Sequence, residues 1–331
     1  MKRRSMLWIA AGLFAALCLL IGNQFVSARP PAEADAPKVE LGQPGLSYRY
    51  VKTLGTSRVP YFVDLVHINR PLGLFIDSGN NLFVTEERGQ RLLKYNASGI
   101  GQFSIGNAGI CINDNYGFCG VNDAVTDSGG NIWVADGNRV AQYSSTGGFL
   151  QQFPTVDPWM SGSDNTRFNS ASGIALDSNG RLFVSDRYNH RVQVFVLSSG
   201  TPVYSTTIGT AGTPGNGANQ FNEPYRIAID GSNRLIVTDR LNNRVQRCAY
   251  SVGWTCTSLD SSLNRPQGVA VANNNDVFIA DTENGRIGSM MLLWIRVVEY
   301  MARRHMRILS YASPVPALCK APLWALNLSP I

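Results

Sequence analysis

Histidine is scarce in this chain of 331 residues: there are three, and only His67 and His190 lie in the body of the sequence. Two histidines cannot supply the three histidine ligands of a usual catalytic zinc site, and no Cys/His spacing indicates a zinc finger, a ribbon or a RING array. The G-x-S-x-G elbow of serine hydrolases is absent. The glycine-rich residues 210–220 lack the Lys-Ser/Thr ending of a phosphate-binding loop. The sequence therefore predicts no catalytic residue, no metal site and no cofactor.

Charged residues are also few, at 16% of the chain, and the net charge of +6 is unevenly placed. Residues 1–28 carry three positive charges, and residues 289–331 carry five positive charges and one negative charge. That leaves 21 positive against 22 negative charges in residues 29–288. A nucleic-acid-binding domain concentrates Lys and Arg on its folded part. A nucleic-acid partner is therefore not expected.

The N-terminus has the features of an export signal. Basic residues at positions 2–4 precede an apolar run at 6–22, and Val26, Ser27 and Ala28 offer the small side chains that a signal peptidase requires. Residues 1–28 are predicted to be a signal peptide or, if retained, an N-terminal membrane anchor. Residues 29–46, rich in Pro, Ala and charge, are predicted to be a disordered linker. The expected location is extracytoplasmic: secreted, periplasmic or on the cell surface.

A repeat organises the rest of the chain. Each of five copies has two short apolar strands around a Gly/Asn turn, then an acidic residue, a short loop, an Arg, a third apolar strand and a looser fourth strand. Four antiparallel strands make one propeller blade, and stacked blades bury one another's apolar faces. Residues 47–289 are therefore predicted to be an all-β propeller. The copies begin at Pro71, Val121, Ser172, Pro224 and Pro266.

The third copy, SGIALDSNGRLFVSDRYNHRVQVF, and the lead-in QFNEPYRIAID of the fourth match an NHL unit almost position by position. The chain resembles the NHL-repeat β-propeller family over residues 66–288. This resemblance implies six blades and most commonly a binding or scaffolding role. Together with the N-terminal export signal, it predicts an exported family member of bacterial type. The pattern fails after Arg286, so residues 290–331 are expected to be a degenerate or frameshifted last blade, with a genuine unusual closure as the alternative. Residues 47–55 look like a fourth strand that completes the last blade.

An acidic residue and an arginine flank the loop between the second and third strands of every copy. A carboxylate and a guanidinium so placed can pair across the hairpin. Because the pair recurs in every blade, its predicted role is structural rather than catalytic. The predicted pairs are Glu86 with Arg91, Asp136 with Arg139, Asp186 with Arg191, Asp239 with Arg244, and Asp281 with Arg286.

Four cysteines fall into two pairs, each with seven residues between its members. Disulfides persist in oxidising compartments, and Cys-x7-Cys is no recognised metal-ligand spacing. The exported interpretation therefore predicts the bonds Cys111–Cys119 and Cys248–Cys256, and it leaves Cys319 without a partner.

The functional hypotheses concern one face of the propeller, where the loops between strands two and three emerge together with the loops between blades. Loops vary freely over a rigid scaffold and so carry most ligand sites. We expect a non-enzymatic, monomeric module that binds a protein, peptide or glycan there, with membrane attachment if the N-terminal segment is retained. The alternative is a propeller enzyme of the lyase or metal-dependent lactonase type, acting on a small molecule or peptide. The candidate ligand-binding residues are Trp159, Arg187, Tyr188, His190, Tyr225, Arg226 and Arg240.

Overall fold

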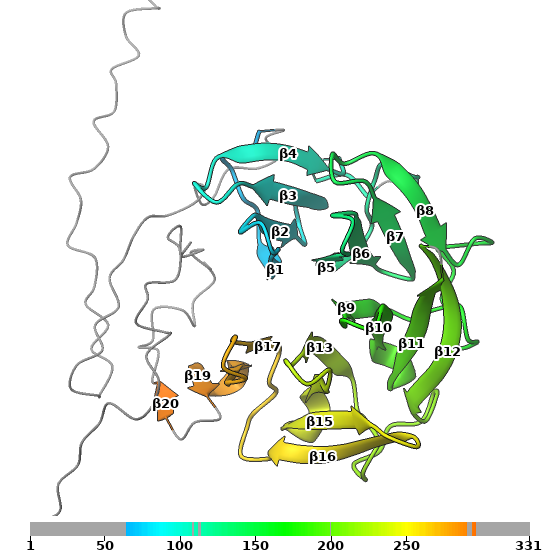
Figure 1. Cartoon of the computed structure of the whole chain (residues 1–331), viewed down its shortest axis with the longest axis vertical. Coiled ribbons are helices and arrows are strands. Elements are labelled where there is room, and N and C mark those ends of the chain that lie inside the picture. The colour runs from blue at the N-terminus through cyan, green and yellow to red at the C-terminus, as the bar shows by residue number, and fades with distance from the viewer. Residues whose placement is uncertain (1–63, 108, 112–113, 199, 290–292, 296–331) are drawn as a thin grey trace, which may run out of the picture. The chain divides into compact units, whose positions relative to one another are not determined.

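The computed structural model describes residues 64–107, 109–111, 114–198, 200–289 and 293–295. These residues form five four-stranded antiparallel sheets, each with its strands in sequence order (Figure 1). The all-β propeller predicted from the repeat is confirmed, with five blades among the described residues where the resemblance implies six. The signal or anchor at 1–28, the linker at 29–46, the strand expected at 47–55 and Cys319 lie outside the described residues.

The strands of each blade follow the order innermost to outermost along the chain (Figure 1). Blade 1 consists of β1 (Pro71–Ile76), β2 (Leu82–Glu86), β3 (Arg91–Tyr95) and β4 (Gly101–Ile105). Blade 2 consists of β5 (Val121–Thr126), β6 (Ile132–Asp136), β7 (Arg139–Tyr143) and β8 (Phe149–Phe153). Blade 3 consists of β9 (Ala171–Leu176), β10 (Arg181–Asp186), β11 (Arg191–Ser198) and β12 (Thr201–Gly209). Blade 4 consists of β13 (Pro224–Ile229), β14 (Leu235–Asp239), β15 (Arg244–Tyr250) and β16 (Trp254–Asp260). Blade 5 consists of β17 (Gly268–Val271), β18 (Val277–Asp281), β19 (Arg286–Ser289) and β20 (Leu293–Ile295).

Blade 5 takes its fourth strand from residues past the domain boundary expected at 289. Short 3-10 helices follow the second strand in the last three blades, namely η1 (Arg187–Asn189), η2 (Arg240–Asn242) and η3 (Thr282–Asn284). Among the described residues, no helix is long and apolar enough to cross a membrane.

In blades 1–4, an aspartate of the repeat holds the turn between the first two strands. In blade 3, Asp177 Oδ1 accepts the backbone N–H groups of Asn179 at 3.0 Å and Arg181 at 2.8 Å. Gly180 has φ +74°, a conformation that glycine adopts without steric cost. An Asx turn of this kind fixes the position of the second strand.

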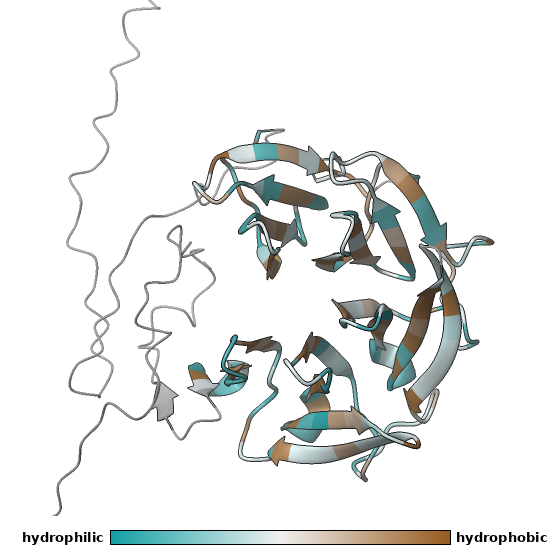
Figure 2. Ribbon diagram, in the orientation of Figure 1, coloured by the Kyte–Doolittle hydropathy of each residue, from teal (hydrophilic) through white to brown (hydrophobic). Residues whose placement is uncertain are grey.

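The core lies between blades rather than within them. Between blades 2 and 3, Trp133, Leu182 and Phe195 are at most 1% exposed, and the rings of Phe153 and Phe195 are 4.7 Å apart. Similar clusters join blades 1 and 2, 3 and 4, and 4 and 5. Figure 2 shows brown segments on strands of every blade. Successive residues of a strand face opposite neighbours, so Leu182 and Val184 pack toward blade 2 and Phe183 packs toward blade 4.

The face of blade 1 that points away from blade 2 is only partly covered by the described residues. Leu65 and Ile68 pack there against the buried Val84, Leu93 and Tyr95, but the innermost strand β1 is left open. Leu74 and Ile76 are 50% and 55% exposed, whereas Ile174, at the corresponding place in blade 3, is 3% exposed. Exposure of this kind is consistent with a sixth blade that has degenerated or been lost.

Both predicted disulfides are confirmed. Cys111 is bonded to Cys119 in the loop that enters blade 2, and Cys248 to Cys256 across β15 and β16 of blade 4. Such bonds suggest an oxidising, extracytoplasmic environment.

Candidate functional site

The acidic residue and the arginine of each repeat lie in contact, with the arginine Nε on a carboxylate oxygen in every blade. The carboxylates are fully buried. The arginine side chains are 0–3% exposed in blades 1–3, 12% exposed in blade 4 and 27% exposed in blade 5. The N–O distances are 2.7 Å for Glu86–Arg91, 2.8 Å for Asp136–Arg139, 2.8 Å for Asp186–Arg191, 2.7 Å for Asp239–Arg244 and 2.6 Å for Asp281–Arg286.

The pair in blade 3 also holds the loop that enters the blade. Asp186 accepts the backbone N–H of Asn169 at 2.7 Å, and Arg191 Nη2 donates to the carbonyls of Asp164 at 2.6 Å and Arg167 at 3.1 Å. Burial raises the pKa of the Asp186 carboxyl, and the surrounding donors partly offset that rise. The sequence pattern did not indicate that the pair anchors this loop. These contacts support the structural role predicted for the pair.

Three copies have glycine at one equivalent position of the inner strand, namely Gly73, Gly173 and Gly268. In blades 1 and 3 the inner strand of the next blade lies too close to this position for a side chain. A Cβ on Gly173 would lie 2.6 Å from the carbonyl oxygen of Tyr225 in the next blade. In blades 2 and 4 the same position holds Asp123 and Arg226, whose side chains enter the axial region.

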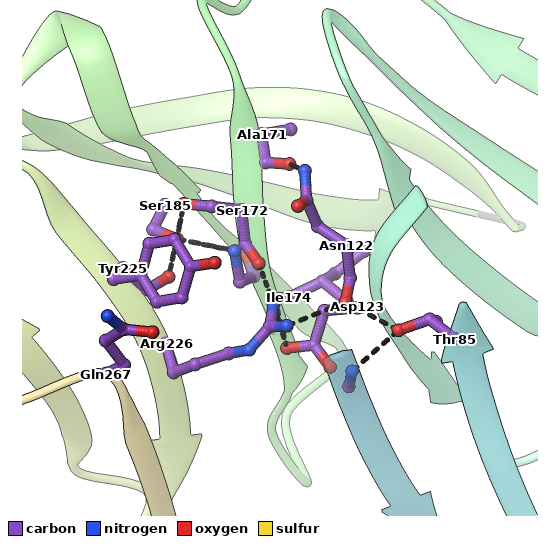
Figure 3. Close-up of polar contacts among 12 residues, drawn as sticks. Thr85, Asn122, Asp123, Ala171, Ser172, Ile174, Ser185, Tyr225, Arg226 and Gln267 are labelled. Carbon is purple, nitrogen blue, oxygen red and sulfur yellow. Dashed lines mark hydrogen bonds and ion pairs between the residues drawn. The ribbon is translucent and has the colours of Figure 1, made fainter. Parts of the chain in front are cut away.

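Arg226 crosses the axial region to reach two other blades (Figure 3). Its guanidinium donates to the carbonyl of Ser172 in blade 3 and, at 2.8 Å, to that of Asn122 in blade 2, and it lies 3.6 Å from the Asp123 carboxylate. Burial raises the pKa of Asp123, and the charge of Arg226 lowers it in part. Arg226, expected among the loop-face residues, is instead 7% exposed, because inner-strand side chains at this position face the axis. Asp123 and Arg226 replace the glycine of the repeat, and this replacement is the sequence feature that could have indicated the pair.

Hydroxyl groups on the second strands also link two blades to the first strand of the next blade. Thr85 Oγ1 donates to the carbonyl of Asn122 at 2.7 Å, and Ser185 Oγ donates to that of Tyr225 at 2.6 Å (Figure 3). Blade 2 has Ala135 at the matching position and instead uses the Asn122 side chain, which donates to the carbonyl of Ala171 at 2.8 Å. The axial region is therefore a polar network that joins blades.

A second polar cluster lies on the loop face and is centred on Glu223, which precedes β13. One carboxylate oxygen of Glu223 accepts Arg187 Nε at 3.0 Å, Arg187 Nη2 at 2.6 Å and Arg240 Nη1 at 2.9 Å. The three side chains are 17–20% exposed. The 3-10 helices η1 and η2 supply the two arginines, which stand at equivalent places in blades 3 and 4. Sequence reasoning missed Glu223, although its place in the lead-in NEPY was visible.

Two tyrosines and the histidine complete this loop-face cluster. The guanidinium carbon of Arg187 is 4.6 Å from the ring centre of Tyr188 and 5.2 Å from that of Tyr225. His190 Nδ1 accepts the backbone N–H of Glu223 at 3.1 Å, so the other ring nitrogen carries the proton of the neutral imidazole. Tyr188 is 46% exposed. Five of the seven candidate ligand-binding residues are thus assembled around Glu223.

Trp159 lies apart from the loop-face cluster. Its ring packs over the guanidinium of Arg139 in blade 2, with the guanidinium carbon 3.7 Å from the ring centre, and its carbonyl accepts Asn138 Nδ2 at 2.9 Å. The contact shields a repeat ion pair from solvent.

The loop-face cluster carries an excess of positive charge, since two guanidinium groups face one carboxylate. Arg187 and Arg240 contact Glu223 through three of their ten N–H groups, and the cluster is partly open to solvent. Such an arrangement suits an acidic group, which guanidinium binds with paired hydrogen bonds. Within the described part of the chain, no group of three or more His, Cys, Asp or Glu side chains could hold a metal ion.

The NHL repeat family model matches residues 168–195 and 263–288. Among curated proteins, the chain is 25% identical over 128 residues to NHL repeat-containing protein 3 of Mus musculus, covering 35% of this chain and 34% of that protein. It is 25% identical over 237 residues to the probable peptidyl-alpha-hydroxyglycine alpha-amidating lyase pgal-1 of Caenorhabditis elegans, covering 67% of this chain and 64% of that protein. The chain thus spans about a third of the first relative and slightly less than two thirds of the second.

Two solved structures share the fold. A streptogramin B lyase superposes with a TM-score of 0.50 at 18% identity, over 72% of this chain and 68% of that one. An auxiliary nutrient binding protein from Bacteroides thetaiotaomicron VPI-5482 superposes with a TM-score of 0.51 at 12% identity, over 72% of this chain and 60% of that one. At these identities the likeness concerns the fold alone.

Proposed function

Because the chain is an NHL-repeat β-propeller with a positively charged cluster on its loop face, we propose that it is a binding module for a protein, peptide or glycan that carries an acidic group. The observation that carries the proposal is the contact of Arg187 and Arg240 with the single carboxylate of Glu223. The proposed module acts outside the cytoplasm as a monomer, either released or held at the membrane by its N-terminal segment.

The geometry supports a ligand that approaches from the loop side. The exposed ring of Tyr188 and the half-buried ring of Tyr225 flank the Arg187 guanidinium. Aromatic and Arg side chains dominate the energetics of protein-binding surfaces. The rigid blades below, linked through Arg226 and the hydroxyl contacts, hold these side chains in place without a ligand.

Titration calorimetry of the purified full chain with a tetraglutamate peptide tests this proposal, with tetraglutamine as the neutral control. We expect the acidic peptide alone to bind, with an affinity that falls as salt is raised. Arg240→Gln should weaken binding by about tenfold, in the range for loss of a charge-assisted contact. Arg234→Gln, in the turn between β13 and β14 at the opposite end of the blade, is the matched control. Equal binding of both peptides, or binding that Arg240→Gln leaves unchanged, contradicts the proposal.

The second candidate is a propeller lyase, which the alignment with the amidating lyase over 237 residues favours. Incubation with a peptidyl-alpha-hydroxyglycine and, separately, with a streptogramin B antibiotic, followed by mass spectrometry, tests it. Turnover lost in His190→Gln would support this candidate over pure binding, whereas unchanged substrates would exclude both of these activities. Metal analysis of the same protein with a lactonase assay tests the metal-dependent form.

A further inference from the structure

A groove of about 780 Å³ lies between blades 3 and 4, and it shares no residue with the loop-face cluster. Outer strand β12 forms one side, the loop between the blades closes one end, and the tip of the β15–β16 hairpin forms the other side. Ligand sites for small molecules commonly have about 300–1,000 Å³. The side chains that carry the argument are Arg181, Thr207, Asn219, Gln220, Tyr250 and Trp254.

Aromatic rings form one wall of the groove. The rings of Tyr250 and Trp254 are 5.4 Å apart, and Trp254 packs edge-on against the buried ring of Phe183 at 5.5 Å. Tyr250 is 55% exposed. Among the described residues, neither the Tyr250 hydroxyl nor the Trp254 indole N–H has a protein hydrogen-bond partner. Each ring therefore presents an apolar face beside a free polar edge.

This aromatic wall is held in position by two constraints at its base. The bond between Cys248 and Cys256 closes the hairpin below the tip. Asn219 joins the loop to the hairpin, since its Nδ2 donates to the carbonyl of Trp254 at 3.0 Å and its Oδ1 accepts the N–H of Cys256 at 2.6 Å. A site fixed before binding loses less entropy when a ligand enters.

Arg181 supplies directed donors without adding net charge. Its guanidinium carbon lies 5.2 Å from the Trp254 ring centre and 5.6 Å from that of Tyr250. Its Nε donates to Asp177 at 2.6 Å, and within the described residues its Nη groups have no protein acceptor. Because Asp177 balances the guanidinium and the other lining residues are uncharged, the groove is electrically neutral.

The repeat by itself does not produce this groove. Blade 4 has the same turn pair, with Arg234 Nε 2.7 Å from Asp230, and Arg234 is not among the residues that line the groove. In the described chain, aromatic rings lie over the turn arginine of blade 3 and not over that of blade 4. Tyr250, Trp254 and the Cys248–Cys256 disulfide are not part of the repeat motif, and they lie together in the β15–β16 hairpin.

We propose that this groove binds a neutral oligosaccharide. A sugar ring has an apolar C–H face that can pack on Tyr250 and Trp254, and hydroxyls around its edge that can accept from the Arg181 Nη groups. The Thr207 hydroxyl and the Gln220 amide offer further hydrogen bonds. The neutral charge balance favours a neutral sugar over an acidic one, and the exposed, open hairpin tip favours a chain of several units over a single one.

The experiment uses the purified full chain and a panel of neutral tetrasaccharides built from glucose, xylose, mannose or N-acetylglucosamine, with a tetragalacturonate as the acidic comparison. Binding is measured by titration calorimetry and by saturation-transfer NMR on the sugar protons. At least one neutral member should bind with a Kd below about 1 mM. Tyr250→Ala and Arg181→Gln should each weaken it by about tenfold or more. Arg234→Gln, which removes the same turn contact in blade 4, should leave the Kd unchanged.

Several outcomes would overturn the proposal. These are no binding of any neutral member at about 10 mM, a preference for the galacturonate, or binding that survives Tyr250→Ala. Should Arg181→Gln unfold the chain, the exposed Tyr250 still provides a variant that leaves the core intact. The result is independent of the loop-face proposal, because Arg240→Gln should not alter sugar binding and Tyr250→Ala should not alter tetraglutamate binding.

Discussion

Replacing Asp186 with alanine tests whether the repeat ion pairs stabilise the propeller. The change leaves Arg191, whose side chain is 2% exposed, without its carboxylate. It also removes the acceptor for the backbone N–H of Asn169. Removing one partner of a buried ion pair costs about 3–5 kcal/mol of unfolding free energy. In a fold of this size that loss lowers Tm by about 6–20 °C, at about 2–4 °C per kcal/mol.

Asp281→Ala is the matched control, since it breaks the same contact in blade 5. The Arg286 side chain there is 27% exposed, so water can solvate the remaining charge. We expect a smaller loss of about 1–2 kcal/mol, mainly from hydrogen bonds. The double variant Asp186→Ala with Arg191→Met should recover part of the loss in blade 3, because no buried charge is left uncompensated.

Guanidinium chloride unfolding followed by tryptophan fluorescence gives the three free energies, and calorimetry gives Tm. Equal losses for the blade 3 and blade 5 variants would refute the argument that burial of the arginine decides the cost. A double variant less stable than Asp186→Ala alone would refute the attribution to an unpaired charge.

Three further perturbations have expected outcomes. Replacing Cys248 and Cys256 with alanine should lower the unfolding free energy by about 2–3 kcal/mol relative to the parent, because an eight-residue loop is no longer closed. Denaturant unfolding of the two proteins measures this difference. Gly173→Ala should cost about 1–3 kcal/mol, since its Cβ would lie 2.6 Å from a carbonyl oxygen, while Gly253→Ala, with nothing within 4 Å, should stay within about 0.5 kcal/mol in the same assay. Burial raises the pKa of Asp123 above the usual value near 3.9 of an unfolded chain, so the folded state takes up the proton first as pH falls. Thermal unfolding between pH 7 and pH 4 should therefore show the parent gaining stability relative to Asp123→Asn as pH is lowered, and an unchanged difference would contradict this.

Much of the fold could be predicted because the same pattern of strands and turns occurs five times in the sequence. The pairing of Asp186 with Arg191 follows from local spacing, and a hairpin brings such residues together whatever surrounds them. The loop-face cluster was predicted in outline, since the residues at the start of η1 and η2 emerge on one face.

Other contacts depend on the placement of whole blades and have no local signature. Asp123 and Arg226 meet although 103 positions separate them in the sequence, and only the ring of blades brings them together. The groove likewise combines Arg181, Asn219 and Trp254 from two blades and a connecting loop. The hydrophobic pattern of a single strand does not indicate such a site, because the distance between its walls depends on how the two blades stack.

Because the ends of its connecting loops are anchored to the blades, the propeller can serve as a scaffold on which loops are exchanged. In blade 3, the carbonyls of Asp164 and Arg167 and the N–H of Asn169 are all held by the repeat pair, while Phe153 ends the strand before the loop. The exposed residues 155–157 thus lie between the end of β8 and Trp159, whose ring covers Arg139 and has to be kept. Foreign loops of similar or greater length could be inserted there without a change in any blade, since closure entropy rises only slowly with loop length. A single chain could in this way display several unrelated recognition loops from one rigid base.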